Sequence, residues 1–559
     1  MKFFSLSKTR YKALICLVLI AALLLSCACG KKEKETVKEL KVGTENITGN
    51  FNPFYAEKEG DKAVVSQIFP SLQVKSANNK FINRCGSISY EYVEGEKVKY
   101  TVTIRNDIYF SDGTNATIDD LLFWYYFISD ATYDGVYKDF YLNDIEGIKE
   151  YYYDSQNYQS DIQRFNGNKK LISEYIKENY ADGISVSEIS GIKRVDNYTC
   201  TILFNSRNIN AVSEINAFLV SRLFYGKDYV KGSADKVKEI TSSAMGCGKY
   251  FLSSFGKGEA ELLTNKFCYG DLPAFRKVTF IDLAAKKKDP VESAKSGYVD
   301  IVGVTADNKT VTSLNGDKIK YVTAAEDCYC SIFFNSRSLD TEVRKMLQSA
   351  CDVYSVIESE YGGNYTKVFM PLSVRFEESP DVDEAYYSQL LTAPLLSQYI
   401  KTLSAYYAGD KQDLEYKILE KFGENIQQYG VKLNITVTDA KDLNAAIKNG
   451  KAQVWIGYTD DGDTCDKYEY YHTGGSMNFT GLSDAGVDDL TERVRKATGF
   501  SDKKDLMQQL LKAVMETAVE MPLFQQRTLI IYNTSVFDQN CVNLMTSYDT
   551  IYSCISELY

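Results

Sequence analysis

The strongest constraint on the fold is a strand–helix–strand pattern in the C-terminal part of the chain. Residues 433–437 are a strand candidate and 454–458 are a buried-looking strand, and 440–449 between them has helical spacing, with Gly450 directly after it. Such a unit places its two strands parallel in a sheet that helices cover. We therefore predict an α/β fold, with a ligand site where the strands end.

Acidic side chains directly follow the second of these strands. Asp460, Asp461 and Asp463 stand where a parallel strand would present them to a ligand. One interpretation is that a carboxylate here binds a cationic group. The other is that the turn is acidic because solvent covers it. The stretch by itself leaves both open.

A second pattern of the same kind lies upstream. Strands are expected at 278–281 and 299–304, with a helix near 290–295 between them. The two patterns together predict that the middle of the chain, about 285–515, is an α/β lobe.

Periodic patterns predict further elements outside these units. Residues 98–104 alternate between apolar and polar, as in a half-buried strand, and a helix is expected over 120–127 with Thr117 or Asp119 at its start. Apolar residues at helical spacing over 343–357 predict one long helix. The stretch 148–178 is interpreted as an insertion.

The first residues indicate export. Four cations precede an apolar run at 13–25, which is short for a membrane span and typical of a signal peptide. The run ends in Leu-Leu-Ser-Cys and resembles the lipobox of bacterial lipoproteins. The resemblance implies that residues 1–26 are removed and that Cys27 is diacylated. Cys29 is a competing acceptor, and an ordinary cleaved signal is the alternative.

Net charge and composition limit the kinds of partner and site that the protein can have. Removing the signal-peptide cations takes the formal net charge from −11 to −15, which argues against nucleic acid and leaves membrane attachment to the lipid on Cys27. His472 is the only histidine, so a multi-histidine metal site is excluded, and a Ser-His-Asp triad would have to use this residue. No phosphate-binding glycine loop is present. We expect a binding protein rather than an enzyme, with no cofactor and no resident metal.

Cysteine usage leaves the disulfides open. Eleven cysteines remain beyond Cys16 and Cys27, an odd number scattered along the chain. Most are expected to be small buried apolar residues, and one or two bridges are possible.

Several separated motifs resemble one family. They are Phe110-Ser111-Asp112-Gly113, Gly246-Cys247-Gly248-Lys249-Tyr250 and Pro522-Leu523-Phe524. In number, order and spacing they resemble the extracytoplasmic solute-binding proteins of peptide/nickel-class ABC transporters, family 5. The resemblance implies a type II periplasmic-binding-protein-like fold, in which two lobes joined by two crossing strands close on a ligand.

The resemblance also implies a domain order. After a tether at 27–39, lobe one is expected at 40–284, with an extra subdomain inserted at about 75–185. Lobe two is expected at 285–515, and residues 516–559 return to lobe one.

Site residues follow from the same resemblance. Gly457-Tyr458-Thr459-Asp460-Asp461 resembles a Gly-Trp-x-x-Asp segment whose Asp pairs with a peptide's α-ammonium. Asp461 takes the Asp position and Tyr458 the Trp position, while Asp463-Thr464 replaces the usual Asp-Pro. Whether Asp460 or Asp461 points into the cleft is therefore open. Tyr458, Trp455 and Tyr468 are candidate walls, and Trp455 is equally compatible with strand core.

The expected function is capture of peptides through their free N-terminus and delivery to an ABC transporter permease. We expect a monomer held by its lipid on the extracytoplasmic side, at the outer face of a Gram-positive membrane or in a periplasm. One alternative is the same fold binding a sugar, amine, metal chelate or signalling peptide. Another is a surface lipoprotein without transport.

Overall fold

The computed structural model describes residues 38–537 and 555, apart from 76–80, 94, 158–159, 161–162, 167, 181–185, 315–318, 381–385, 387–394, 463 and 498–499. The predicted signal peptide, Cys27 and Asp463 lie outside the described residues. Within them, no helix has the length and apolar character needed to cross a membrane.

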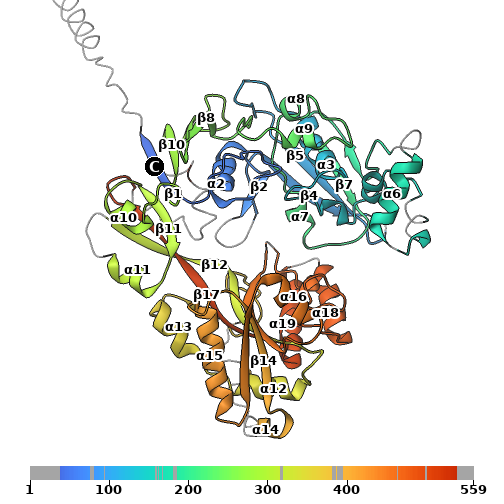
Figure 1. The fold of residues 1–559 in the computed structure, drawn as a ribbon. Coiled ribbons are helices and arrows are strands. Elements are labelled where there is room, and N and C mark those ends of the chain that lie inside the picture. The colour runs from blue at the N-terminus through green and yellow to red at the C-terminus, as the bar shows by residue number, and fades with distance from the viewer. Residues whose placement is uncertain are drawn as a thin grey trace, which may run out of the picture.

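Two lobes lie one above the other, and two long strands join them (Figure 1). The strands are β12 (Ile319–Phe334) and β17 (Glu520–Asn533), which pair antiparallel along most of their length. β12 carries the chain from the first lobe into the second, and β17 carries it back. We call the part from α2 (Glu59–Ile68) to α9 (Asp235–Lys238) lobe one, and the part from α12 (Thr341–Ser349) to α19 (Phe500–Thr517) lobe two.

The main sheet continues through both lobes. Its strands follow the order β15-β14-β16-β12-β17-β11-β1-β10-β9-β8, with β13 beside β17. The remaining strands of this sheet are β1 (Glu39–Thr44), β8 (Tyr250–Gly256), β9 (Glu259–Thr264), β10 (Lys277–Asp282), β11 (Ile301–Thr305), β13 (Thr366–Lys367), β14 (Thr402–Ala408), β15 (Lys432–Thr438) and β16 (Val454–Asp460).

Lobe one contains two further sheets. The larger has the order β4-β5-β7-β6, formed by β4 (Gly86–Tyr92), β5 (Val98–Ile104), β7 (Thr199–Phe204) and β6 (Ile192–Arg194). β2 (Gln73–Lys75) and β3 (Phe81–Asn83) pair as the third. Along β5, alternate residues are buried, as the sequence predicts. Helix α3 (Ile118–Ile128) begins at Thr117, and Asp120 completes a capping box with it.

Helices surround the sheets of both lobes. In lobe two, α12, α13 (Tyr354–Tyr361) and α15 (Leu414–Gln427) pack on one face of the sheet around Ile332, Leu347 and Phe422. The other described helices are η1 (Phe140–Leu142), α4 (Ile148–Tyr153), α6 (Lys169–Tyr180), α7 (Ala211–Glu214), α8 (Arg222–Tyr225), α10 (Pro290–Lys295), α11 (Asn308–Ser313), α14 (Leu396–Tyr399), α16 (Ala440–Lys448), α17 (Tyr468–Tyr471) and α18 (Ala485–Arg495).

Both predicted strand–helix–strand units are present, each with an additional strand between its two strands. β14 lies between β15 and β16 and is parallel to both. β1 lies between β10 and β11 in the same way. The prediction of parallel strands is confirmed. The inserted strands come from distant parts of the chain, so a local pattern does not reveal them.

The prediction of one helix over 343–357 is wrong. The chain forms α12 and α13 with a break between them. The backbone N–H of Cys351 bonds to the carbonyl of Gln348 in a tightened last turn, and the N–H of Asp352 bonds to the Asn425 side chain at 3.1 Å. The apolar residues on both sides of the break still enter one core.

The expected lobe boundary at residue 285 stays a prediction. β11 pairs in parallel with β1, which places Ile301–Thr305 beside the first strand of the chain. The chain crosses between the lobes along β12.

Candidate functional site

The pairing of β16 with β12 points the C-terminal end of β16 toward lobe one. β12 runs from lobe one into lobe two, and β16 is antiparallel to it, with Cys328 opposite Asp460 and Phe333 opposite Trp455. β16 therefore runs back toward lobe one. The residues after Asp460 lie at the edge of lobe two that faces the cleft.

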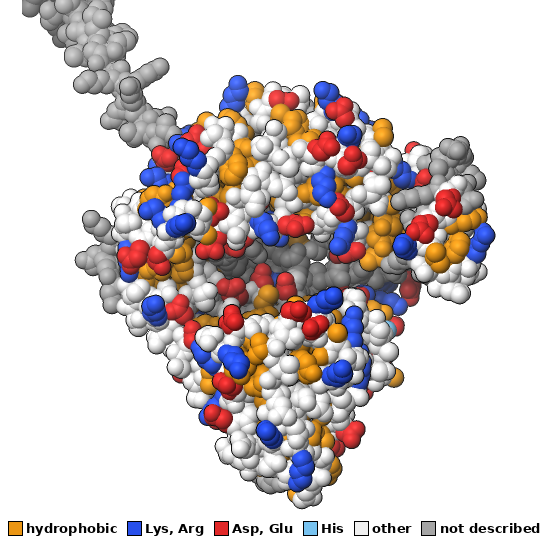
Figure 2. Space-filling view, viewed as in Figure 1, with side chains coloured by type: hydrophobic (Ala, Val, Ile, Leu, Met, Phe, Trp, Pro, Cys, Tyr) orange, Lys and Arg blue, Asp and Glu red, His pale blue; other side chains and the backbone are white. Residues whose placement is uncertain are grey.

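A cavity of about 1010 Å³ lies between the lobes and is lined by both. Lobe one contributes Trp124, Tyr137 and Arg207 among others, and lobe two contributes Tyr468, Glu469 and Arg495. Figure 2 shows the hollow between the upper and lower lobes. Its volume lies at the upper end of the range for small-ligand sites, and its lining mixes aromatic, acidic and basic groups.

The lobes contact each other beside this cavity. The Asn210 side-chain amide donates to Asp466 Oδ2 at 2.8 Å, and the Ile209 N–H donates to the Arg495 carbonyl at 2.9 Å. The Thr464 hydroxyl donates to Asn210 Oδ1. We call these contacts of Ile209 and Asn210 with lobe two the interlobe clasp. Together with the two hinge strands, the clasp holds the lobes against each other at a second place.

Arg495 orders the lobe-two wall of the cavity. Its guanidinium lies 2.6 Å from Asp466 Oδ2 and 3.8 Å from the centre of the Tyr468 ring. Glu469, at 3.5 Å from the same guanidinium, also accepts from the N–H and hydroxyl of Ser476, both at 2.9 Å. Arg495 thus pairs with two acids of this wall, Asp466 and Glu469.

A smaller cavity of about 500 Å³ lies nearer the hinge. It adjoins Thr44 and Thr305, at the carboxyl ends of the parallel strands β1 and β11. Its lining includes Glu45, Glu59 and Glu326, so this part of the cleft is acidic. The carboxyl ends of parallel strands are where α/β sheets hold ligands.

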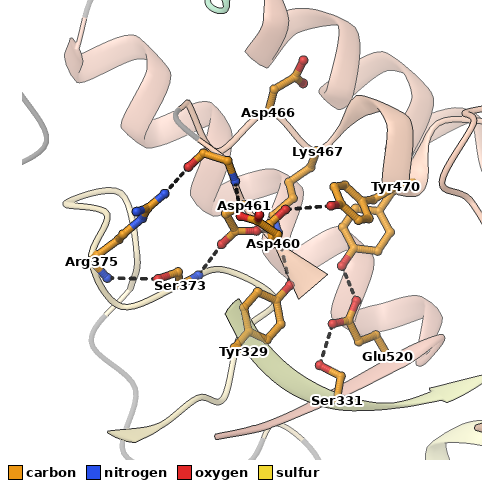
Figure 3. A network of polar contacts seen from close by, with 12 residues as sticks. Tyr329, Ser331, Ser373, Arg375, Asp460, Asp461, Asp466, Lys467, Tyr470 and Glu520 are labelled. Atoms are coloured by element: carbon orange, nitrogen blue, oxygen red, sulfur yellow. Dashed lines mark hydrogen bonds and ion pairs between the residues drawn. The ribbon is translucent and has the colours of Figure 1, made fainter. Parts of the chain in front are cut away.

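Asp461 is buried in lobe two. Its side chain has no solvent exposure, and the Lys467 ammonium, also without exposure, forms an ion pair with Oδ1 (Figure 3). The Ser373 N–H donates to Oδ2 at 2.5 Å. Burial raises the pKa of the Asp461 carboxyl, and Lys467 acts in the opposite direction.

The pair belongs to a larger buried network. Lys467 Nζ also lies 3.1 Å from the Tyr329 hydroxyl. Nearby, Glu520 accepts hydrogen bonds from the hydroxyls of Ser331, at 2.7 Å, and Tyr471. Burial raises the pKa of the Glu520 carboxyl. Sequence analysis missed Lys467, Tyr329 and Glu520. The one available signal was a lysine six residues after Asp461, which no periodicity marks as buried.

The other predicted site residues occupy three different environments. Asp460 is exposed, and its Oδ1 accepts from the Gly462 N–H at 2.8 Å. Tyr458 is 41% exposed, and its hydroxyl donates to Glu415 at 2.5 Å. Trp455 is buried and stacks on Phe333, with ring centres 5.6 Å apart.

The positions of these residues do not test whether they bind a ligand, so their role in binding stays a prediction. Of the candidate residues and walls, Tyr468 lines the large cavity, whereas Trp455, Tyr458, Asp460 and Asp461 are not among the described residues that line it. Asp460 is the exposed one of the two acids and Asp461 the buried one.

The described part of the chain holds no cluster of three or more metal-ligating side chains. His472 lies 3.5 Å from Glu492 and 2.8 Å from the Thr473 carbonyl. The described cysteines are all free, and five of them are buried. The prediction of small buried residues therefore holds for these five.

Comparison with solved structures shows the fold. CtaP from Listeria monocytogenes, an ABC transporter substrate-binding protein, is 16% identical with a TM-score of 0.69, covering 93% of this chain and 99% of that one. The oligopeptide-binding protein AppA from Bacillus subtilis, in complex with a nonapeptide, is 14% identical with a TM-score of 0.64, covering 93% and 98%. NikZ from Campylobacter jejuni, in complex with Ni(L-His), is 14% identical with a TM-score of 0.61, covering 89% and 94%.

No curated protein matches the chain in sequence. The model of the middle region of family 5 of the bacterial extracellular solute-binding proteins matches residues 89–479, well over half of the chain. The predicted family and the two-lobed periplasmic-binding-protein-like fold are confirmed. The chain belongs to family 5 of the bacterial extracellular solute-binding proteins.

Proposed function

We propose that the protein captures peptides between its lobes and delivers them to the permease of an ABC transporter. The observation that carries the proposal is the cavity of about 1010 Å³ that both lobes line. Aromatic side chains and paired charges line it, which suits a chain held by backbone hydrogen bonds with little regard to side-chain identity. AppA, of the same fold, holds a nonapeptide.

The protein acts, on this proposal, from the outer side of a membrane. Cys27 carries the lipid, and the segment 27–39 spans the distance to the folded body. The body has a net negative charge, so it gains no electrostatic attraction to anionic lipid. The protein works as a monomer and without a cofactor.

A cationic solute other than a peptide is the second candidate. The acidic cavity near the hinge favours it, since Glu45, Glu59 and Glu326 line the space and none of the described residues that line it is a lysine or arginine. NikZ, of the same fold, binds a nickel–histidine complex.

A thermal-shift screen separates these candidates. The protein lacking residues 1–29 is heated with di- to octapeptides, and in parallel with sugars, polyamines and nickel–histidine. A ligand that binds only the folded state raises the melting temperature by mass action. Stabilisation by peptides supports the proposal. Stabilisation by polyamines or nickel–histidine alone transfers it to the second candidate, and no shift with any ligand contradicts both.

A further inference from the structure

We propose that Lys467 stays paired with the Asp461 carboxylate when a ligand binds. The protein then recognises peptides independently of a free N-terminal ammonium, and it accepts N-acylated peptides as well as peptides with a free N-terminus. This inference rests on the proposed function. It assigns Lys467 as a residue that determines specificity. The ligand class is peptides whose N-terminus need not be a free ammonium.

The Asp461 side chain is buried, and both of its carboxylate oxygens already accept from groups of the chain. One oxygen accepts from the Lys467 ammonium and the other from the Ser373 N–H. The loop that carries Ser373 is held in place by Arg375 of the same loop, which donates to the Gly462 carbonyl and lies beside Ser373 in Figure 3. Arg375 also forms an ion pair with Asp327. A ligand ammonium would have to displace both the lysine and this loop.

Lys467 is enclosed by aromatic side chains. Its side chain has no solvent exposure, and its ammonium lies 5.1 and 5.4 Å from the centres of the Tyr329 and Tyr470 rings. Withdrawing it would leave Asp461 and Glu520 as buried carboxyl groups without a cation between them. Breaking a buried ion pair by removing one partner is strongly unfavourable because the remaining charge is uncompensated.

Two carboxylates of the lobe-two wall, those of Asp466 and Glu469, are also paired with groups of the chain. Asp466 pairs with Arg495 and accepts from Asn210 across the cleft. Glu469 accepts from Ser476 and lies near the same arginine. Each of these acids is neutralised by a group of the chain itself. A peptide in the large cavity therefore meets the Asp466 and Glu469 carboxylates already paired within the chain, as the Asp461 carboxylate is.

The test needs no variant. A peptide that stabilises the full chain, purified in detergent, is titrated by calorimetry in its free and N-acetylated forms. If the free ammonium formed a charge-assisted hydrogen bond with the protein, acetylation would weaken binding roughly tenfold or more. We expect the two dissociation constants to differ by less than about tenfold. A loss of tenfold or more overturns the inference, whichever carboxylate is responsible.

Variants test the assignment of Lys467 itself. In Lys467→Ala, ethylammonium can enter the vacated space and pair with Asp461, so we expect millimolar ethylammonium to raise the melting temperature of this variant. The wild type and the double variant Asp461→Asn/Lys467→Ala should show no such rise. Equal shifts in all three proteins would overturn the assignment.

A paired variant guards against loss of folding. Asp461→Asn/Lys467→Met removes both charges together and should bind the free peptide within about tenfold of the wild type. A larger loss would overturn the inference. A wild type that binds no peptide overturns both the function and this inference, whereas one that binds free peptides alone overturns only the inference.

Discussion

Asn210 of lobe one donates a hydrogen bond of 2.8 Å to the carboxylate of Asp466 in lobe two. Arg495 holds the same carboxylate from the lobe-two side, at 2.6 Å. The contact joins two segments that are 256 residues apart in the chain. Because of this contact, the distance between the lobes depends on the Asn210 side chain as well as on the hinge strands.

Asn210→Ala should shift the protein toward a more open form. A hydrogen bond to a charged group contributes about 1.5–3 kcal/mol to the stability of the form that contains it. Peptide affinity falls in proportion to the fraction of molecules that remain in the binding-competent form. We expect a larger radius of gyration by small-angle X-ray scattering and weaker peptide binding. Asn197→Ala is the control, because the Asn197 side chain is exposed and bonds to Arg194 within lobe one. Unchanged scattering and affinity in Asn210→Ala would contradict a role for the clasp.

Trp455→Ala should destabilise the fold without changing peptide affinity. The indole is 6% exposed and stacks on Phe333 within a small apolar cluster, so its removal leaves a cavity that costs about 3–5 kcal/mol. Urea unfolding and calorimetry on the same samples measure the two effects. Trp455→Phe keeps most of the packing and should lose less stability. A variant with normal stability and weak peptide binding would instead show that the ring is a ligand wall.

Glu520→Gln should change how stability depends on pH. Burial raises the pKa of Glu520 above the ordinary value of 4.5, so the native state binds this proton more tightly than the unfolded state does. Stability from this group is therefore present at low pH and is lost as pH rises from about 4.5 through the folded-state pKa. The loss is about 1.4 kcal/mol for each pH unit between the unfolded-state pKa and the folded-state pKa.

Glutamine carries no charge and keeps one acceptor oxygen for either the Ser331 or the Tyr471 hydroxyl, while its NH2 group can donate to the other. The stability of Glu520→Gln relative to the wild type should thus increase with pH over that interval. Urea unfolding of both proteins from pH 4 to 8 measures this difference in the free energy of unfolding. Parallel curves for the two proteins would mean that Glu520 does not titrate within this range.

Cys27→Ser should release the protein from the membrane. The lipobox resemblance implies that the thiol of Cys27 carries the lipid, and serine has no thiol to acylate. Detergent-phase partitioning of cells that express each form provides the measurement. Cys29→Ser is the matched control and should stay in the detergent phase. Release by Cys29→Ser alone would move the lipid to that cysteine.

Much of the architecture could be predicted from local patterns and from the resemblance. The parallel strands at β15 and β16, the half-buried β5 and the capping of α3 by Thr117 follow from periodicity and side-chain chemistry. The break between α12 and α13 could not be predicted, because the apolar spacing continues through it while a tertiary bond to Asn425 ends the first helix.

The site was less predictable for a physical reason. Asp461 was identified from a motif, but its burial depends on Ser373, Tyr329 and Lys467, which three different segments bring together. A turn rich in acids has the same sequence pattern whether solvent or a lysine neutralises it. Trp455 illustrates the same limit, since a strand residue can face a cleft or a core.

Photo-crosslinking tests the central claim most directly. A stabilising peptide that carries a benzoylphenylalanine is bound to the protein and irradiated, and the crosslinked residues are identified by mass spectrometry. A peptide held between the lobes should label both 207–216 of lobe one and 468–496 of lobe two, the segments that line the large cavity. An excess of the unlabelled peptide should abolish both products. Labelling confined to one lobe or to the outer surface would contradict capture between the lobes.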